Sequence, residues 1–273
     1  MKGSFVKRIC ILLCLLLTAC NPTSTPQTPS NSVQSPLNEA QSAVLNLNIF
    51  NRDATLSSLS SESNALFLAD VGNQESVAYI ETIAEQSFIA LSDNPAGTDD
   101  NSWSLQASPS IPISYVIDVT SGTLSATLTD LIVSRFDLVA ETATIDVTLP
   151  TSELQMAVDA TASTVNLHMP IGSQASSVQL TSTDGFITMT LEDGVNLIGN
   201  LSITSGGMTI TVPTSTGVQI LVENAENSEI TLPNNPRSVA EASIYTTPNF
   251  DQTTAKVILT STLIGATLRI IQE

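Results

Sequence analysis

Apolar and polar side chains alternate in short runs along most of the chain, and turn residues separate the runs. An alternation with a period of two predicts strands that have one buried and one exposed face. From residue 113 the runs recur, and six of them align end to end: GTLSATLT (122–129), ATIDVTLP (143–150), STVNLHMP (163–170), GFITMTLE (185–192), GMTITVP (207–213) and SEITLP (228–233). Their last residues lie 21, 20, 22, 21 and 20 positions apart. A step this constant predicts stacked structural repeats.

A second alternating run precedes each copy, so the repeat unit is strand, turn, strand, turn. Stacked units place equivalent residues in ladders, and the inward positions are mid-sized aliphatic side chains. On the second strand these are Leu124, Ala126, Leu128, Ile145, Val147, Leu149, Val165, Leu167, Met169, Ile187, Met189, Leu191, Met208, Ile210, Val212, Ile230 and Leu232, and on the first strand Ile117, Leu138, Val158, Leu180 and Leu201. We expect two closely packed sheets with no room for a large ring between them.

The predicted fold is all-β: a β-solenoid with two-strand rungs of about 21 residues over 113–233 and capping hairpins at both ends. Segment 43–112 alternates without this register, which predicts antiparallel strands capping the first end. Segment 234–273 is the expected second cap, and its last run, AKVILTSTLIGATLRII, supplies a closing hairpin or rung. The folded domain therefore spans 43–273.

The repeats ending in DVTLP, ITVP and EITLP, and the closing GATLRII, resemble the toast-rack domains and related adhesin-like β-solenoids of bacterial envelopes. Acidic-glycine or similar turns of that kind occur at Asp184-Gly185 and Ser121-Gly122, but not at Glu141-Thr142 or Glu226-Asn227. Toast-rack domains occur in membrane proteins of the LiaF type, which are associated with cell-wall stress signalling. The resemblance implies a fold and an envelope setting, and it supplies no catalytic residues.

The first twenty residues indicate export. Lys2, Lys7 and Arg8 precede an apolar run of 11 residues, Ile9 to Ala19, which is too short to span a bilayer and is typical of a signal peptide. The run ends in Leu17-Thr18-Ala19-Cys20, which resembles the bacterial lipobox. We expect cleavage after residue 19 and a lipid on Cys20, with an ordinary signal peptide or an uncleaved anchor as the alternatives.

Residues 20–42 are the expected lipidated cysteine and a disordered tether, because Pro, Ser, Thr, Asn and Gln dominate them. As a coil the tether would hold the domain roughly 25 Å from the lipid. The protein would then be attached by its lipid to the extracytoplasmic face of the bacterial cell membrane.

Composition narrows the possible functions. All three cysteines, Cys10, Cys14 and Cys20, lie in the export segment, so the folded part has no disulfide. The formal charge of −18 becomes about −21 without the signal, because five basic residues then face 26 acidic ones. A surface this acidic is unsuited to nucleic acid. An envelope protein or a glycan is the expected kind of partner.

Several groups of residues can be interpreted either as a functional site or as ordinary surface structure. Thr127, Thr148, His168, Thr190, Thr211 and Thr231 form an outward ladder. The ladder is either a flat hydroxyl array, as in ice-binding solenoids, or threonine favoured on a solvated strand face. The mixed neighbouring ladder, Ser125, Asp146, Asn166, Thr188, Thr209 and Glu229, favours the second interpretation. His168 is either a ligand or a solvated surface histidine. Loop 93–101 is rich in oxygen ligands, so it is either a calcium site or a polar hairpin loop.

The chain lacks the sequence signals of the common enzyme classes. Asp118, Asp146 and Asp159 are expected to face outward, which gives no convergent carboxylate pair for glycoside hydrolysis. No Gly-x-Ser-x-Gly elbow, P-loop or Cys-x-x-Cys motif occurs. We expect no catalytic residue, cofactor or metal. The predicted function is that of a non-enzymatic, lipid-anchored binding or envelope-stress accessory module. An adhesin-like surface protein and, third, a glycan-active β-helix enzyme are the alternatives.

Overall fold

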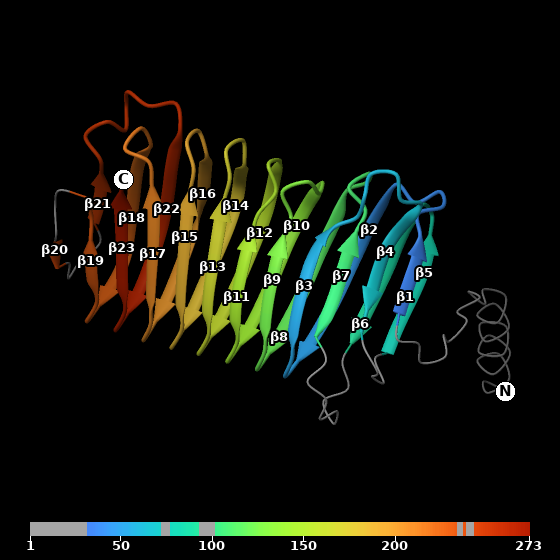
Figure 1. Ribbon diagram of the computed structural model, residues 1–273. Coiled ribbons are helices and arrows are strands. Elements are labelled where there is room, and N and C mark those ends of the chain that lie inside the picture. The colour runs from blue at the N-terminus through green and yellow to red at the C-terminus, as the bar shows by residue number, and fades with distance from the viewer. Residues whose placement is uncertain (1–31, 72–76, 93–101, 234–236, 239–242) are drawn as a thin grey trace, which may run out of the picture.

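The computed structural model describes residues 32–71, 77–92, 102–233, 237–238 and 243–273, and these form two large β-sheets with no helix (Figure 1). The all-β prediction is confirmed. The strands lie side by side in an elongated stack, with the N-terminal strands at one end and the C-terminal strands at the other. Successive strands cross from one sheet to the other through most of the chain, so each sheet takes roughly every second strand.

One sheet has 12 strands. Across the sheet they are β1 (Ser32–Pro36), β4 (Ala65–Asp70), β7 (Trp103–Ala107), β3 (Asp53–Ser58), β9 (Thr123–Thr127), β11 (Thr144–Thr148), β13 (Thr164–Met169), β15 (Phe186–Leu191), β17 (Gly207–Val212), β23 (Thr267–Gln272), β19 (Glu229–Thr231) and β20 (Arg237–Ser238).

The other sheet has 11 strands. Across the sheet they are β5 (Val77–Ile83), β6 (Gln86–Ser92), β2 (Ser42–Phe50), β8 (Ile113–Thr120), β10 (Val133–Glu141), β12 (Glu153–Thr161), β14 (Gln174–Thr183), β16 (Asn196–Thr204), β22 (Lys256–Ile264), β18 (Gly217–Glu226) and β21 (Ser243–Thr246).

The repeat register holds through the middle of the stack. In the 12-stranded sheet Thr123 pairs with Thr144, Thr144 with Thr164, and Thr164 with Phe186, all in parallel. Phe186 then pairs with Gly207, so the steps from β9 to β17 are those of the sequence repeat. The predicted inward residues on these strands are buried, because the two-residue alternation turns one side chain of each pair into the space between the sheets.

The last predicted step of the repeat is wrong. Gly207 pairs with Thr267, and Thr267 pairs in turn with Glu229. The C-terminal strands β22 and β23 therefore lie between β16–β17 and β18–β19, where the sequence order places no strand. They form a rung within the stack and not its end. Among the described residues the end is made by the short antiparallel strands β20 and β21.

The first end has the same kind of insertion. Strands β2 and β3 lie between β6–β7 and β8–β9, with Ala43 paired in parallel with Ile113. The prediction of antiparallel hairpins throughout 43–112 is thus correct only in part. Strands β4 and β5 pair only antiparallel, β4 with β1 and β7 and β5 with β6. Strands β6 and β7 each have one antiparallel and one parallel neighbour, and β2 and β3 pair in parallel on both sides.

Part of the expected tether is folded. Strand β1 lies within 20–42 and pairs with β4, and the Val33 side chain is only 5% exposed. Prolines and polar residues surround Val33, which explains why the composition of the segment hid the strand.

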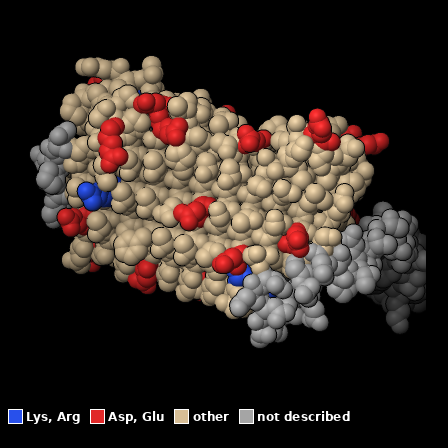
Figure 2. Space-filling model, viewed as in Figure 1, with Lys and Arg blue, Asp and Glu red and all other residues tan. Residues whose placement is uncertain are grey.

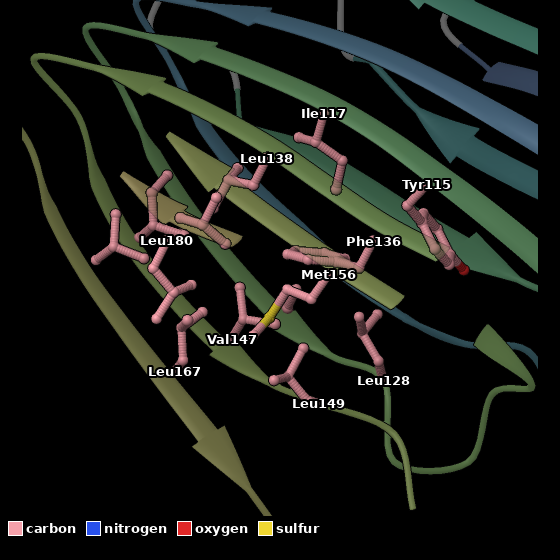
Figure 3. Close-up of a cluster of buried hydrophobic side chains, with 14 of the residues drawn as sticks. Tyr115, Ile117, Leu128, Phe136, Leu138, Val147, Leu149, Met156, Leu167 and Leu180 are labelled. Atoms are coloured by element: carbon pink, nitrogen blue, oxygen red, sulfur yellow. The ribbon is translucent and has the colours of Figure 1, made fainter. Parts of the chain in front are cut away.

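Large rings do fit between the sheets, contrary to the expectation from composition. Trp103, Tyr115, Phe67 and Phe136 are fully buried in the N-terminal half of the stack. Tyr115 and Phe136 occupy paired positions on β8 and β10, and Met156 follows on β12 (Figure 3). The core therefore changes along the stack, from rings at the first end to aliphatic side chains beyond.

A row of sharp corners joins the two strands of each rung. The corner residue has a positive φ, between 48° and 55° for the seven non-glycine members of the row: Asn51, Ser121, Thr142, Ala162, Asp184, Ser205 and Asn227. The amide of the Ser121 corner donates to the Glu141 carbonyl of the next rung, and Thr142 donates in the same way to Thr161. The residue after the corner is Gly, Ala or Ser in every rung of this row except at Arg52. At Gly206 a Cβ would lie 2.3 Å from the Gly185 carbonyl oxygen, so close stacking of the corners demands small residues there.

Candidate functional site

Three rows of outward side chains run across the middle of the 12-stranded sheet, from β9 to β17. The His168 row is Thr127, Thr148, His168, Thr190 and Thr211; the Asn166 row is Ser125, Asp146, Asn166, Thr188 and Thr209; the Phe186 row is Thr123, Thr144, Thr164, Phe186 and Gly207. The rows exist because the strands are parallel and in register, which sets equivalent side chains about 4.8 Å apart. Figure 2 shows that this face is mostly neutral, with acidic side chains scattered over it.

The predicted hydroxyl ladder is correct up to Thr211 and wrong at Thr231. Thr211 pairs with Ile271 on the inserted strand β23, and Thr231 pairs with Arg269. Because Arg269 also pairs with Thr209, Thr231 belongs to the line of the Asn166 row. Glu229, predicted for that row, pairs instead with Thr267 in the line of the Phe186 row. A cation and an isoleucine thus end the hydroxyl pattern at the C-terminal side.

A shallow hollow of about 200 Å³ lies in the middle of this face. Its polar lining comes from the His168 and Asn166 rows: Ser125, Thr127, Asp146, Thr148, Asn166, His168, Thr188 and Thr190. The Asn166 side-chain amide donates to Asp146 Oδ1 over 2.7 Å, which fixes an amide beside a carboxylate in its floor. The second carboxylate oxygen, the amide oxygen and one amide hydrogen have no further hydrogen-bond partner among the described residues.

His168 is partly exposed at the edge of the hollow, as expected of a surface histidine. Its Nε2 lies 3.0 Å from Glu192 Oε1. The other carboxylate oxygen of Glu192 accepts a hydrogen bond from the Ile171 amide over 3.1 Å. Glu192 therefore holds the imidazole in place between β13 and the turn after β15, and only Nδ1 remains for a further partner.

Phe186 is the feature of this face that the sequence analysis missed. It stands in a row of threonines, yet it is 61% exposed. A Cβ added at Gly207 would lie 2.9 and 3.0 Å from its ring atoms Cδ1 and Cε1, so the ring leans over the glycine of the next strand. The signal in the sequence is the pair Gly206-Gly207. Gly206 is the small residue that follows the Ser205 corner, whereas Gly207 lies one position further on, where the corner does not require a glycine.

The three aspartates considered for glycoside chemistry all face outward, as predicted, and they do not share one face. Asp146 is on the 12-stranded sheet. Asp118 and Asp159 are on the 11-stranded sheet, where each pairs with Val139, so one strand separates them. No cleft formed by the described residues brings all three together.

A second hollow, of about 480 Å³, lies at the corner row and is lined by Asn51, Arg52, Asp53, Ser121, Gly122, Thr123 and Thr142. Arg52 is only 6% exposed. The Cζ atom of its guanidinium lies 5.3 Å from the centre of the buried Trp103 ring. This cation therefore packs on the aromatic core of β7 and is part of the structure of the corner.

Two predicted sites, Cys20 and loop 93–101, lie outside the described residues. Within the described part of the chain, no group of three His, Cys, Asp or Glu side chains is placed to hold a metal ion. None of the described segments forms a helix long and apolar enough to cross a membrane.

No family model matches the sequence, and no curated protein matches it. Two solved structures resemble the fold. One is a putative cell adhesion protein from Clostridium sporogenes, with a TM-score of 0.44, 14% identity, and coverage of 92% of this chain and 100% of that one. The other is a putative adhesin from Bacteroides fragilis, with a TM-score of 0.32, 11% identity, and coverage of 90% and 99%. Similarity at this level establishes neither a family nor a function.

Proposed function

We propose that this chain is a non-enzymatic, lipid-anchored binding protein at the extracytoplasmic face of the bacterial cell membrane. Its folded body would be a β-solenoid of the toast-rack kind. The observation that carries the proposal is the middle of the 12-stranded sheet, where three rows of mostly hydroxyl-bearing side chains run in register from β9 to β17. A rigid face of this kind offers hydrogen-bonding groups at regular intervals to an extended partner.

The anchoring part of the proposal rests on the sequence. The basic start, the short apolar run and Leu17-Thr18-Ala19-Cys20 support export and lipid attachment. With about −21 charges on the mature chain, electrostatics would oppose contact with anionic headgroups, so the lipid would have to supply the attachment.

Membrane fractionation of a Cys20→Ser variant tests the anchor. The wild-type protein should sediment with membranes and leave them only in detergent, whereas the variant should lose the lipid. A metabolic label with an alkyne fatty acid distinguishes lipid loss from misfolding. Membrane retention of an unlabelled variant would show that another segment attaches the protein.

Site-specific crosslinking in intact cells tests the binding face. A photoreactive residue at Thr190 on the hollow should capture an envelope component, and the same residue at Gln179, exposed on the opposite sheet, should not. Equal capture from both positions, or none from Thr190, would contradict the assignment of the binding face. A captured sensor protein would support the stress-accessory role.

An adhesin-like role is the alternative, because an exposed neutral face on a tether would also suit contact with another surface. Attachment assays separate the two roles: deletion of the gene should reduce adhesion of whole cells if the protein is an adhesin, and should leave adhesion unchanged if its partner lies in the same envelope. Polysaccharide turnover that stops on an Asp146→Asn substitution would instead support the enzyme reading.

A further inference from the structure

We propose that the hollow and Phe186 together form a carbohydrate-binding site for a neutral pyranose chain. The inference rests on the proposed binding function of this face and adds the class of ligand. It combines an exposed aromatic ring, an amide–carboxylate pair and neutral hydroxyls on three neighbouring strands, β11, β13 and β15.

The ring supplies an apolar surface. Phe186 is exposed, and Gly207 provides the space into which one edge of the ring leans. A threonine at position 207 would suit the strand and continue the row, since Thr144, Thr164 and Thr267 occupy equivalent positions. The contact with Gly207 explains the position of the Phe186 ring. It does not explain why an exposed phenylalanine stands in a row of threonines. A ligand with an apolar face that stacks on the ring would explain it.

The polar groups lie at a suitable distance from the ring. Phe186 pairs with Thr164, and Asn166 follows two residues along the same strand and points to the same side. The diagonal between Phe186 and Asn166 is about 8 Å, from a strand spacing of about 4.8 Å and two residues at about 3.3 Å. One sugar ring stacked on Phe186 can therefore direct a hydroxyl toward Asn166.

The amide–carboxylate pair suits vicinal hydroxyls. Because Asn166 Nδ2 uses one hydrogen on Asp146 Oδ1, the pair still offers one donor and two acceptors outward. The hydroxyls of Thr148, Thr188 and Thr190 can donate or accept, so both hydrogen-bonding roles of a sugar hydroxyl are met within the hollow. Neutral ligands are favoured over anionic ones, since Asp146 lies in the hollow and the chain carries a formal charge of −18.

Saturation-transfer NMR and calorimetry on the lipidated protein, purified from membranes in detergent, test the site with neutral hexasaccharides (cellohexaose, chitohexaose and maltohexaose) as probes. At least one hexasaccharide should bind, and the saturation transferred to it should be strongest on the C–H protons of its sugar rings. Phe186→Ala should weaken that binding at least tenfold, Phe186→Trp should retain it, and Asn166→Ala should also weaken it. Phe50→Ala, which removes a partly exposed ring from the opposite sheet, is the matched control and should change affinity less than twofold.

Gly207→Thr is a second variant that keeps every ligand-facing group and displaces only the ring. It should fold as well as the wild type and weaken sugar binding as Phe186→Ala does. Three results would overturn the proposal: no binding of any hexasaccharide, equal effects of Phe186→Ala and Phe50→Ala, or unchanged affinity in Gly207→Thr. Capture of a protein from Thr190 together with no sugar binding would overturn the ligand class and leave the proposed function intact. Membrane retention of Cys20→Ser would contradict the anchor without bearing on sugar binding.

Discussion

At the scale of the residue, the corner row places the tightest demands on the sequence. Seven corners hold a non-glycine residue in the left-handed region, which costs about 1 kcal/mol each. Amide hydrogen bonds from one corner to the next rung offset this cost, as between Ala162 and the Thr183 carbonyl over 2.9 Å. The following residue is small at each of these corners except Asn51, where it is Arg52, because the rungs stack closely there. Each corner is therefore a pair of residues: the first must adopt a positive φ, and the second is limited in size by the neighbouring rung.

Glycine should have opposite effects at the two members of such a pair. Ala162 is exposed with a φ of 48°, so Ala162→Gly should relieve strain and raise the free energy of unfolding by about 1 kcal/mol. Ala143, buried after the preceding corner, has no positive φ to relieve, and Ala143→Gly should lower that free energy by about 1 kcal/mol. Urea unfolding of both variants measures the difference. Destabilisation by Ala162→Gly would show that the corner carries no strain.

A buried hydroxyl provides a second test. Tyr115 is fully buried, and its hydroxyl has no hydrogen-bond partner among the described residues. Tyr115→Phe should raise the free energy of unfolding by about 1 kcal/mol, whereas Phe136→Tyr, at the paired position, should lower it.

The same hydroxyl affects stability at high pH. Burial raises the pKa of Tyr115, so the folded state keeps its proton while the unfolded state loses it above about pH 10. Stability should fall as the pH rises past that point, and it should fall less steeply in Tyr115→Phe. Equal slopes in the two proteins, measured by thermal unfolding between pH 8 and 11, would show that Tyr115 is not the responsible group.

At the scale of the element, each strand is defined by which of its faces is buried. Alternation was enough to predict the inward residues from β9 to β17, because burial on a strand depends on local sequence order. Ile145 is fully buried and its neighbour Thr144 is exposed, although both lie on β11. The register of the strand is therefore open to a direct test.

Ile145→Asp should lower the free energy of unfolding by about 3 kcal/mol or more, because it places a carboxylate between the sheets. Thr144→Asp adds the same charge to the same strand on its outer face and should change stability by no more than about 0.5 kcal/mol. Circular dichroism melts compare the two. A reversed order would show that β11 is shifted by one residue.

The sequence was less informative where a feature depends on neighbours that are distant along the chain. Composition could not locate the buried rings, because a low aromatic content does not reveal that Tyr115 and Phe136 occupy paired positions. The hydroxyl rows followed from periodicity, but the role of Gly207 did not, since it depends on a ring from the adjacent strand. The hollow likewise depends on which strands pair, and strand order could be read only where consecutive repeats are also neighbours in space.

At the scale of the whole molecule, both ends of the stack contain a rung inserted out of sequence order. The strand pair β2–β3 lies inside the first end, and β22–β23 lies inside the second. Each inserted rung pairs in parallel with a rung on either side, so segments 42–58 and 256–272 are held within the sheets and not at their edges. An alternation of period two is compatible with any position of a strand within the sheet. The sequence pattern therefore could not predict that these rungs are inserted out of order.

Engineered disulfides should report the strand order directly. Thr209 and Arg269 pair on adjacent strands, so Thr209→Cys with Arg269→Cys should form a disulfide, in a full chain whose Cys10, Cys14 and Cys20 are replaced by Ser. Thr209→Cys with Thr231→Cys should not, because β23 separates those positions by two strand spacings, about 9.6 Å. The sequence repeat would make Thr211 and Thr231 neighbours on adjacent strands, so Thr211→Cys with Thr231→Cys tests that order. The two cysteines of this variant should also stay reduced. Mass spectrometry after mild oxidation distinguishes the pairs, and a disulfide between positions 211 and 231 would show that the last rung follows the sequence order after all.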